Sequence, residues 1–160
     1  MKEQEIYIDN VTERRNFFQR YFPLKVGKKR ADVNSEDILK NSCPVCGYLT
    51  LDERDSSEIC GICFWEDDGI DDVEGHENSG PNHITLKEGR TIFEEAKRKL
   101  FNANHGENNL LDELRSRFLT LDGLIEQNNP DKSEILRQQS EIIDLLTKNK
   151  VYGLGNLWSK

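Results

Sequence analysis

The chain has 160 residues, of which 32% are charged and 35% are apolar, and its formal net charge is −8 at pH 7. This length suits one domain, or a small module with a helical attachment, and the composition permits only a modest core. The sequence contains no apolar run long enough to cross a membrane, and its first residues, Met1 to Glu5, are charged rather than signal-like, so we expect a cytoplasmic protein with no membrane partner.

The acidity of the chain is concentrated in one segment. Residues 43–80 contain eleven Asp and Glu and a single base, Arg54. Residues 1–40 contain nine Lys and Arg against seven acids, and residues 81–160 contain twelve of each. A nucleic-acid ribbon needs a basic face that displaces phosphate counterions, so nucleic acid is not the expected partner. The acidic segment predicts either solvated loops or a surface complementary to a basic protein.

The N-terminal region is predicted to form a helix followed by a basic loop. Asn10 and Glu13 have the spacing of a capping box, which predicts a helix over residues 11–22 that Pro23 ends. The aromatic side of this helix is expected to pack on the cysteine-rich region and comprises Phe17, Phe18, Tyr21 and Phe22. At residues 25–34 a solvated loop is favoured over a nucleic-acid patch because acidic residues follow its bases, Lys25, Lys28, Lys29 and Arg30.

The four cysteines of the chain form two C-x-x-C units separated by thirteen residues: Cys43 and Cys46, then Cys60 and Cys63. Two such units facing each other supply four sulfur ligands in a tetrahedron, which predicts a Zn(Cys)4 site. Iron in a rubredoxin-like site would use the same ligands, and zinc is the favoured metal. Gly47 follows the first unit and suits a turn that requires a positive φ. Four protein ligands leave no open coordination position, so the site is expected to be structural.

Two other roles for the cysteines fit their surroundings less well. Cys43-Pro-Val-Cys46 resembles the redox pair of glutaredoxin-like proteins, but such a pair begins a helix. Here residues 48–51 are predicted to form a strand that pairs with residues 58–59 through a turn at 52–57. The redox hypothesis also leaves the second pair unexplained. Structural disulfides are not expected because a cytosolic chain keeps its thiols reduced.

A second helix is predicted after the cysteine-rich loops. Thr85 and Glu88 form a capping box, and His105-Gly106 is predicted to end the helix that it begins. The apolar residues recur with helical spacing, which places on one face Leu86, Gly89, Phe93, Ala96 and Leu100.

The C-terminal third is predicted to be an αα-hairpin with an apolar tail at residues 151–158 that docks on the rest of the chain. The first stripe comprises Leu111, Leu114, Phe118, Leu121 and Ile125. After a break at Asn128-Asn129-Pro130, Asp131 caps the second helix, whose stripe comprises Ile135, Gln139, Ile142 and Leu146, with Leu136 and Ile143 beside it. Such stripes more often pack within one chain than between copies, so we expect a monomer or a small homo-oligomer.

The segment Phe64-Trp65-Glu66-Asp67-Asp68-Gly69-Ile70-Asp71-Asp72, together with the two C-x-x-C units, resembles the bacterial cysteine-rich CPCC family. That family is named for a C-P-C-C-G knuckle followed by an I-C-x-x-C-F-W-E-D-D segment. The resemblance is specific over residues 43–72 and looser over 80–95. Val45 stands where the family name implies a third cysteine, which favours the two outer cysteines as the ligands, and Gly89 stands where the family more often has alanine. The resemblance implies a small metal-binding fold without an established enzymatic activity.

We therefore predict an α+β fold in which a small zinc-ribbon-like β-hairpin module is flanked by α-helices. Its regions are an N-terminal helix and basic loop (1–41), the zinc-binding module with its following helix (42–104), and a helical hairpin with a tail (105–160). The metal is expected to hold an acidic, tryptophan-bearing surface for a partner with a basic surface. The candidate surface residues are Trp65, Glu66, Asp67, Asp68, Asp71 and Asp72.

Three alternatives to this non-enzymatic adaptor remain open. The first is an immunity-type protein that neutralises a basic, nuclease-like toxin. The second is a zinc ribbon that binds nucleic acid through the bases of residues 25–34. The third is a metal-dependent hydrolase that uses the acidic cluster with His76 and His83. A structural role for the acids, in which those near residue 66 cap a turn or bind nearby N–H groups while Trp65 covers the metal, is favoured over this enzymatic one.

Overall fold

The structure is a computed structural model that describes residues 2–21, 41–71, 74–104, 106, 108–127 and 130–158. The predicted basic loop at residues 25–34 lies outside these ranges, as do Phe22, Pro23, Asp72 and His105. Among the residues described, no helix is both long and apolar enough to span a membrane.

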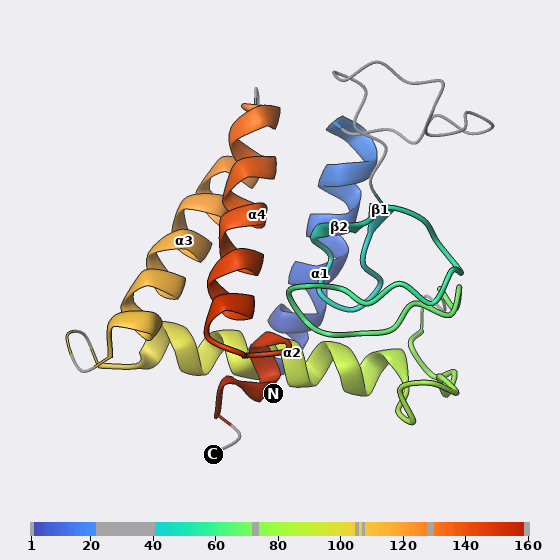
Figure 1. The fold of residues 1–160 in the computed structure, drawn as a ribbon. Helices are drawn as coiled ribbons and strands as arrows, with labels where there is room; N and C mark the ends of the chain where they lie inside the picture. Colours follow the sequence, from blue (N-terminus) through green and yellow to red (C-terminus); the bar gives the residue numbers. More distant parts are fainter. Residues whose placement is uncertain are drawn as a thin grey trace.

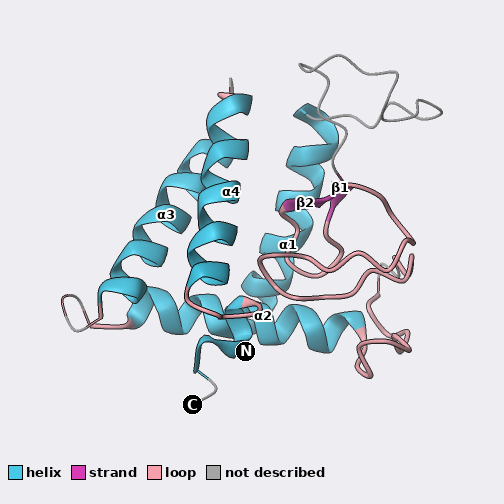
Figure 2. Ribbon diagram, in the orientation of Figure 1, coloured by secondary structure: helices cyan, strands magenta, loops and turns pink. Residues whose placement is uncertain are grey.

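In the described ranges, four α-helices are combined with a two-stranded antiparallel sheet, which confirms the predicted α+β class. The elements in chain order are α1 (Lys2–Tyr21), β1 (Asn41–Ser42), β2 (Leu49–Leu51), α2 (Leu86–Asn102), α3 (Asn109–Ile125), α4 (Lys132–Lys148) and the 3-10 helix η2 (Leu154–Trp158). Helix α2 forms a base from which α1, α3 and α4 rise, and α3 and α4 stand side by side (Figure 1). The strands lie among the cysteine-containing loops beside α1 (Figure 2).

One hydrophobic core joins the three predicted regions. Its buried members include Phe18 of α1, the cysteine-containing loops, Phe93 of α2, Phe118 of α3 and Ile142 of α4. Leu154 of the tail is also buried in this core, which confirms that the tail docks. The helices outside the cysteine-rich loops therefore pack against those loops directly.

The structure confirms the caps and faces predicted for the later helices. The side chain of Thr85 accepts a hydrogen bond from the backbone N–H of Glu88 at 3.1 Å, and Asp131 accepts one from Glu134 at 3.1 Å. All five residues of the predicted apolar face of α2 are buried. Of the two stripes, the buried members are Leu114, Phe118, Leu121, Ile135, Gln139, Ile142 and Leu146.

Two helix boundaries were predicted wrongly. Helix α1 begins at Lys2, so Asn10 lies inside it; residues 2–9 contain no Gly or Pro, and nothing in them interrupts the helix. Helix α2 ends at Asn102 rather than at His105-Gly106. Its end is satisfied by the guanidinium of Arg115, which donates hydrogen bonds to the carbonyl oxygens of Leu100 (2.9 Å) and Ala103 (2.6 Å).

The predicted strand pairing was also wrong. Strand β2 pairs with β1, with Asn41 opposite Leu51 and Ser42 opposite Leu49, and not with residues 58–59. Ile59 instead forms an isolated bridge with Glu66. Each C-x-x-C turn brings together the residues that flank it, so each unit forms its own small hairpin. Within residues 41–71, which are all described, no strand of the first unit pairs with a strand of the second.

Candidate metal centre

The first C-x-x-C unit folds as a tight knuckle over residues 43–48. The backbone N–H of Cys43 donates to the carbonyl oxygen of Tyr48 at 2.8 Å, and the N–H of Gly47 donates to the oxygen of Cys43 at 2.9 Å. Gly47 has a φ of +79°, which confirms the predicted positive φ at this turn.

The second knuckle, residues 60–65, repeats this geometry. The N–H of Cys60 donates to Trp65 at 2.9 Å, and the N–H of Phe64 donates to Cys60 at 2.9 Å. Phe64 occupies the position of Gly47 and also has a positive φ, +66°. Because the two loops have the same backbone geometry, the cysteine side chains of both units point to the same centre.

The four sulfur atoms gather into one cluster. The Sγ atoms of Cys43 and Cys63 are 3.6 Å apart, as are those of Cys46 and Cys60. All four lie within 4.8 Å of one another. Zn–S bonds of about 2.3 Å in a tetrahedron place sulfurs about 3.8 Å apart, whereas a disulfide requires about 2.05 Å. The cluster therefore fits one tetrahedral metal ion, and no disulfide joins these cysteines.

The match to known families covers this part of the chain. Residues 41–99 match the model of the cysteine-rich CPCC family. No curated protein and no solved structure matches the chain. The CPCC segment, residues 41–99, contains both knuckles and most of α2, whereas α1, α3 and α4 lie outside it.

Two buried arginines bind the first knuckle of the CPCC segment. Arg14 of α1 donates from Nε to the carbonyl oxygen of Cys46 at 2.8 Å, and Arg90 of α2 donates from Nε to that of Pro44 at 2.9 Å. Four thiolates around a divalent cation have a net charge of −2, so two positive side chains hydrogen-bonded to this knuckle would stabilise a metal-loaded site. No sequence pattern indicates either arginine, because neither is near the cysteines in the chain.

The thiols themselves show why the site needs a cation. Burial raises the pKa of Cys46 and of Cys63 above the ordinary range of a thiol. Burial acts the same way on Cys60, but hydrogen bonds from the other three thiols and from Thr50, whose Oγ1 lies 3.0 Å from its sulfur, lower the pKa of that thiol overall. Four thiolates cannot be held together in a buried site unless a metal ion compensates their charge.

Trp65 and Val45 lie between the knuckles and α2. A Cβ atom at Gly89 would lie 2.9 Å from Cζ3 of Trp65 and 3.2 Å from Cγ2 of Val45, so only glycine allows this approach of the helix. The side chain of Val45 thus faces α2, which agrees with Cys43 and Cys46 as the ligands of the first unit. The close packing of Trp65 and Val45 explains why glycine occupies position 89, although glycine has a lower helix propensity than alanine.

The acidic residues after the second knuckle are largely engaged within the CPCC segment. Asp67 is fully buried and accepts hydrogen bonds from Nε of Arg54 (2.9 Å) and from the backbone of Asp55 (2.8 Å) and Gly69 (3.3 Å). Burial raises the pKa of Asp67, but the hydrogen bond from Arg54 and the backbone donors outweigh it and lower the pKa overall. Asp68 binds the hydroxyl of Ser79 at 2.8 Å.

The predicted interaction surface therefore needs correction. Trp65 is 4% exposed and Asp67 is 0% exposed, so neither presents its side chain to a partner. Glu66 and Asp68 are half-buried, and Asp71 is exposed but pairs with Arg15 at 2.6 Å. The alternative prediction that acids near residue 66 bind nearby N–H groups is confirmed for Asp67 and Asp68. Among the described residues, only the four cysteines bring three or more metal-ligating atoms together.

A third loop of the CPCC segment has the knuckle geometry without cysteines. The N–H of Ser79 donates to Ile84 at 3.0 Å, that of His83 donates to Ser79 at 2.8 Å, and His83 has a φ of +62°. Asn82 occupies the position of a second cysteine, and its amide bridges the N–H and C=O of Glu66 at 3.0 and 2.8 Å. This loop holds the segment after Trp65 in place by hydrogen bonds, whereas the other two loops supply metal ligands. Apart from the turn-forming residues Gly80-Pro81-Asn82, no sequence pattern indicates this loop.

Proposed function

We propose that this protein is a non-enzymatic zinc-binding protein, in which a structural Zn(Cys)4 site holds an acidic surface that binds a basic protein. The supporting observation is the cluster of four sulfurs within 4.8 Å of one another, three of them on buried cysteines. Such a site has no open position for a substrate or an activated water, so its metal stabilises the loops rather than reacting. Zinc is the favoured metal for four thiolates, and iron would use the same ligands.

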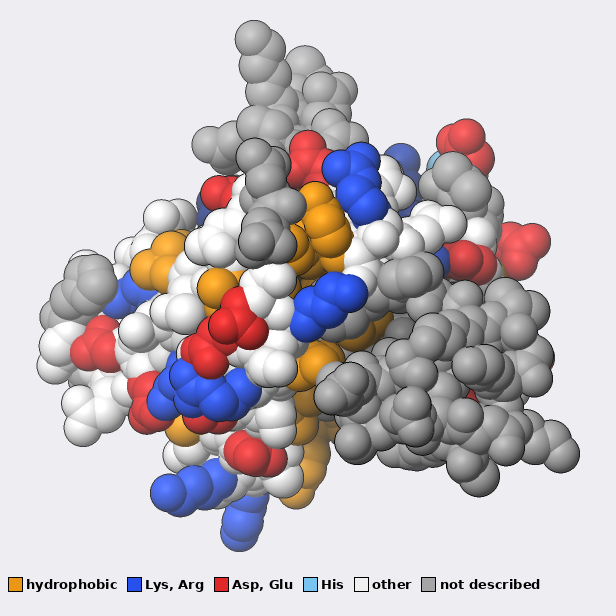
Figure 3. All heavy atoms as spheres, turned by 90° about the horizontal axis from the view of Figure 1, so that it is seen from above, with side chains coloured by type: hydrophobic (Ala, Val, Ile, Leu, Met, Phe, Trp, Pro, Cys, Tyr) orange, Lys and Arg blue, Asp and Glu red, His pale blue; other side chains and the backbone are white. Residues whose placement is uncertain are grey.

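The proposed surface consists of the exposed carboxylates on the loops of the CPCC segment. With the buried residues removed, these are Glu53, Asp55, Asp71, Glu74 and Glu77. Acidic side chains lie at the upper right-hand edge in Figure 3, with a few basic ones beside them, on the side where Figure 1 places these loops. Opposite potentials would steer a basic partner to these loops.

The metal part of the proposal is tested by metal analysis of the purified chain. We expect one zinc per chain, and we expect Cys60→Ser to lose both the metal and the folded structure, because the metal joins the two knuckles and the free energy of binding a structural zinc is folding free energy. Ser140→Ala, at an exposed position of α4, is the control and should keep both. A Cys60→Ser chain that is folded and free of metal would contradict the structural role.

The partner part is tested by affinity capture on the zinc-loaded chain with elution by salt. We expect basic proteins to be retained and to be lost when Glu53, Glu74 and Glu77 are changed to Gln. A matched variant changes the same number of exposed acids on the helical hairpin: Glu113, Glu126 and Asp144. Equal capture by the two variants would rule out the acidic loops as the binding surface.

The same capture experiment separates the more specific alternatives. An immunity-type role predicts that the captured protein is a basic toxin encoded beside this chain and that its activity is inhibited. Nucleic-acid binding predicts salt-sensitive retention of oligonucleotides that is lost when Lys25, Lys28, Lys29 and Arg30 are neutralised. A hydrolase would show activity that depends on Asp68 with the zinc site intact.

A further inference from the structure

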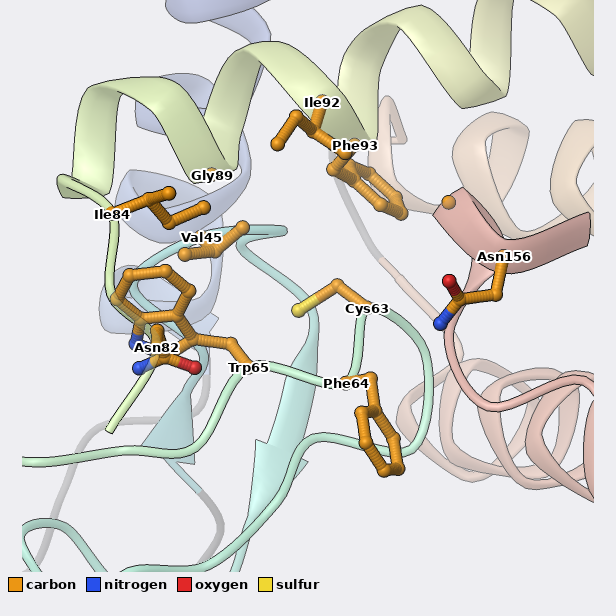
Figure 4. Close-up of a pocket in the computed structure, with 11 residues that line it drawn as sticks. Val45, Cys63, Phe64, Trp65, Asn82, Ile84, Gly89, Ile92, Phe93 and Asn156 are labelled. Carbon is orange, nitrogen blue, oxygen red and sulfur yellow. The ribbon is translucent and has the colours of Figure 1, made fainter. Parts of the chain in front are cut away.

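A pocket of about 350 Å³ lies beside the metal centre, between the second knuckle, α2 and the tail (Figure 4). It is lined by both knuckles, by the loop of Asn82, and by residues of α2 and η2. Cys63, the one metal-site cysteine that is not fully buried, is on its wall. Its volume is at the small end of the range of about 300 to 1,000 Å³ typical of binding pockets.

Exposed hydrophobic side chains gather at the rim of this pocket. In the described part of the chain five large hydrophobic residues are exposed, and two of them, Phe64 (45%) and Ile92 (51%), line the pocket. A third, Tyr152 (55%), packs its ring against that of Phe64 with centroids 5.9 Å apart. Single exposed apolar residues are common, but a group around a pocket is typical of a binding surface.

Phe64 is also held in an unfavourable backbone conformation. Its φ is +66°, a region in which an aromatic residue costs roughly 1–2 kcal/mol relative to the right-handed region. The equivalent position of the first knuckle is Gly47, so the fold itself requires no aromatic side chain here. This conformation leaves the Phe64 side chain 45% exposed beside the pocket.

The charges on α2 beside Ile92 indicate what kind of partner would fit. Glu88 and Glu95 are four residues before and three residues after Ile92, so they lie on the same face of α2, and both are exposed. An apolar side chain that enters the pocket would therefore have carboxylates next to it. Lysine or arginine beside that side chain would complement them.

We propose that this pocket is the anchor site for a protein segment that inserts one large apolar side chain flanked by Lys or Arg. Interfaces derive most of their affinity from such a buried anchor, with charged residues at the rim. The inference rests on the proposed function, since it takes the partner to be a basic protein, and it adds the point of contact. The contact is apolar at its centre, whereas the acidic loops contribute attraction around it.

A displayed library of random peptides, selected on the zinc-loaded full chain, tests this site. We expect enriched peptides to combine Trp, Phe, Tyr or Leu with a neighbouring Lys or Arg. A synthetic copy of one such peptide should bind at least about tenfold more weakly to Ile92→Gln, a loss typical of a truncated anchor contact. The matched control is Leu119→Gln on α3, which removes a 59% exposed side chain away from the pocket and should bind within about twofold of the unchanged chain.

Each other outcome overturns a defined part. Absence of enrichment, or equal binding to Ile92→Gln and Leu119→Gln, rules out the pocket as the anchor site. Binding that depends on Ile92 but is unchanged in Glu88→Gln/Glu95→Gln rules out the basic flank. If peptide binding does not depend on the pocket while salt-sensitive capture through Glu53, Glu74 and Glu77 persists, the proposed function stands without this inference. If the chain folds without metal, the proposed function is wrong, and the peptide experiment alone decides whether the pocket is a binding site.

Discussion

Gly47 lies where the first knuckle meets α1, and both its backbone and its lack of a side chain are used there. Its φ is +79°, and a Cβ atom would lie 3.0 Å from the carbonyl oxygen of Val11 and 3.1 Å from Cβ of Arg14. We expect Gly47→Ala to lower the free energy of unfolding by about 2 kcal/mol. The left-handed conformation is unfavourable for alanine, and its Cβ atom also displaces α1. Chemical denaturation of the zinc-loaded chain measures this.

Gly123→Ala is the control for that substitution. Gly123 lies in α3, nothing is within 4 Å of the position of its Cβ, and its φ is not positive. Alanine should therefore stabilise the chain by roughly 0.5–1 kcal/mol through helix propensity. If both alanine variants changed stability in the same direction, the role assigned to Gly47 would be wrong.

Asp67 is the buried acid on which the loop after the second knuckle depends. Asp67→Asn removes a charge that accepts hydrogen bonds from Arg54 and from two backbone N–H groups, and we expect a loss of about 2 kcal/mol. The pKa of Asp67 is below its ordinary value, so its stabilisation is present above the unfolded pKa of about 3.9 and is lost as pH falls through the lower native value. Between about pH 5.5 and 8 the carboxyl is ionised in both states, so the measured deficit should not change.

Asp71→Asn is the comparison for Asp67. Asp71 contacts the same Arg54 at 3.8 Å, but its side chain is 45% exposed. An exposed ion pair contributes little, at most about 1 kcal/mol, so this variant should differ only slightly from the unchanged chain. Equal losses in the two variants would show that burial of Asp67 is not what makes it important.

At the scale of elements, the local features were predictable and the long-range ones were not. The caps at Thr85 and Asp131 depend on residues three positions apart, so sequence spacing predicted both correctly. The four ligands were predictable because two C-x-x-C turns define the metal geometry themselves. The arginine contacts to the first knuckle join residues 32 and 46 positions apart, and no periodic pattern indicates such a pair.

Burial was the other feature that local patterns could not predict. Asp67 belongs to an acidic run that resembles a solvated loop, and its burial depends on Arg54 thirteen residues earlier. The positive φ at Phe64 was unexpected because an aromatic residue disfavours it. The start of α1 was predicted wrongly because the spacing of Asn10 and Glu13 suggested a helix cap. The residues before Asn10 contain nothing that interrupts a helix, and α1 in fact begins at Lys2.

The tail is the element that closes the second knuckle, and Gly153 makes the contact possible. The N–H of Leu154 donates to the carbonyl oxygen of Ile62 at 2.7 Å, and a Cβ atom at Gly153 would lie 2.7 Å from Cβ of Phe64. Gly153→Ala, at a φ of +89°, should weaken this docking by about 2 kcal/mol, which raises the population with an undocked tail about thirtyfold. Transfer of zinc to a chromogenic chelator should accelerate accordingly, because Cys63 becomes more accessible.

Gly155→Ala provides the control for the tail. Its Cβ would lie 3.3 Å from Cγ2 of Ile92, and its φ is not positive, so the tail can stay docked. We expect a rate of zinc transfer within about twofold of the unchanged chain. Equal acceleration in both variants would mean that the tail does not protect Cys63.

At the scale of the whole molecule, buried charges connect the CPCC segment to the helices outside it. Arg14 of α1 pairs with Glu94 of α2, and Lys97 of α2 pairs with Asp122 of α3 at 2.6 Å. The hydroxyl of Tyr48, in the first knuckle, donates to Asp122 at 2.6 Å and accepts from Lys97 at 2.8 Å. Each of these groups has its partner on another element, so the network is complete only when α1, α2, α3 and the knuckle are all in place.

Glu94→Gln tests that network at its most buried pair, since the side chains of Arg14 and Glu94 are 7% and 3% exposed. We expect a loss of about 3–5 kcal/mol, because the change leaves the charge of Arg14 buried without its carboxylate partner. Arg14→Met/Glu94→Gln should cost less than the sum of the two single changes by about 1–3 kcal/mol in a double-mutant cycle measured by chemical denaturation. Glu113→Gln, in a pair with Arg117 that is largely exposed, is the control and should change little. If the two single losses were additive, Arg14 would stabilise the first knuckle through its bond to Cys46 alone, and α1 would be held to the metal centre without any contribution from the ion pair.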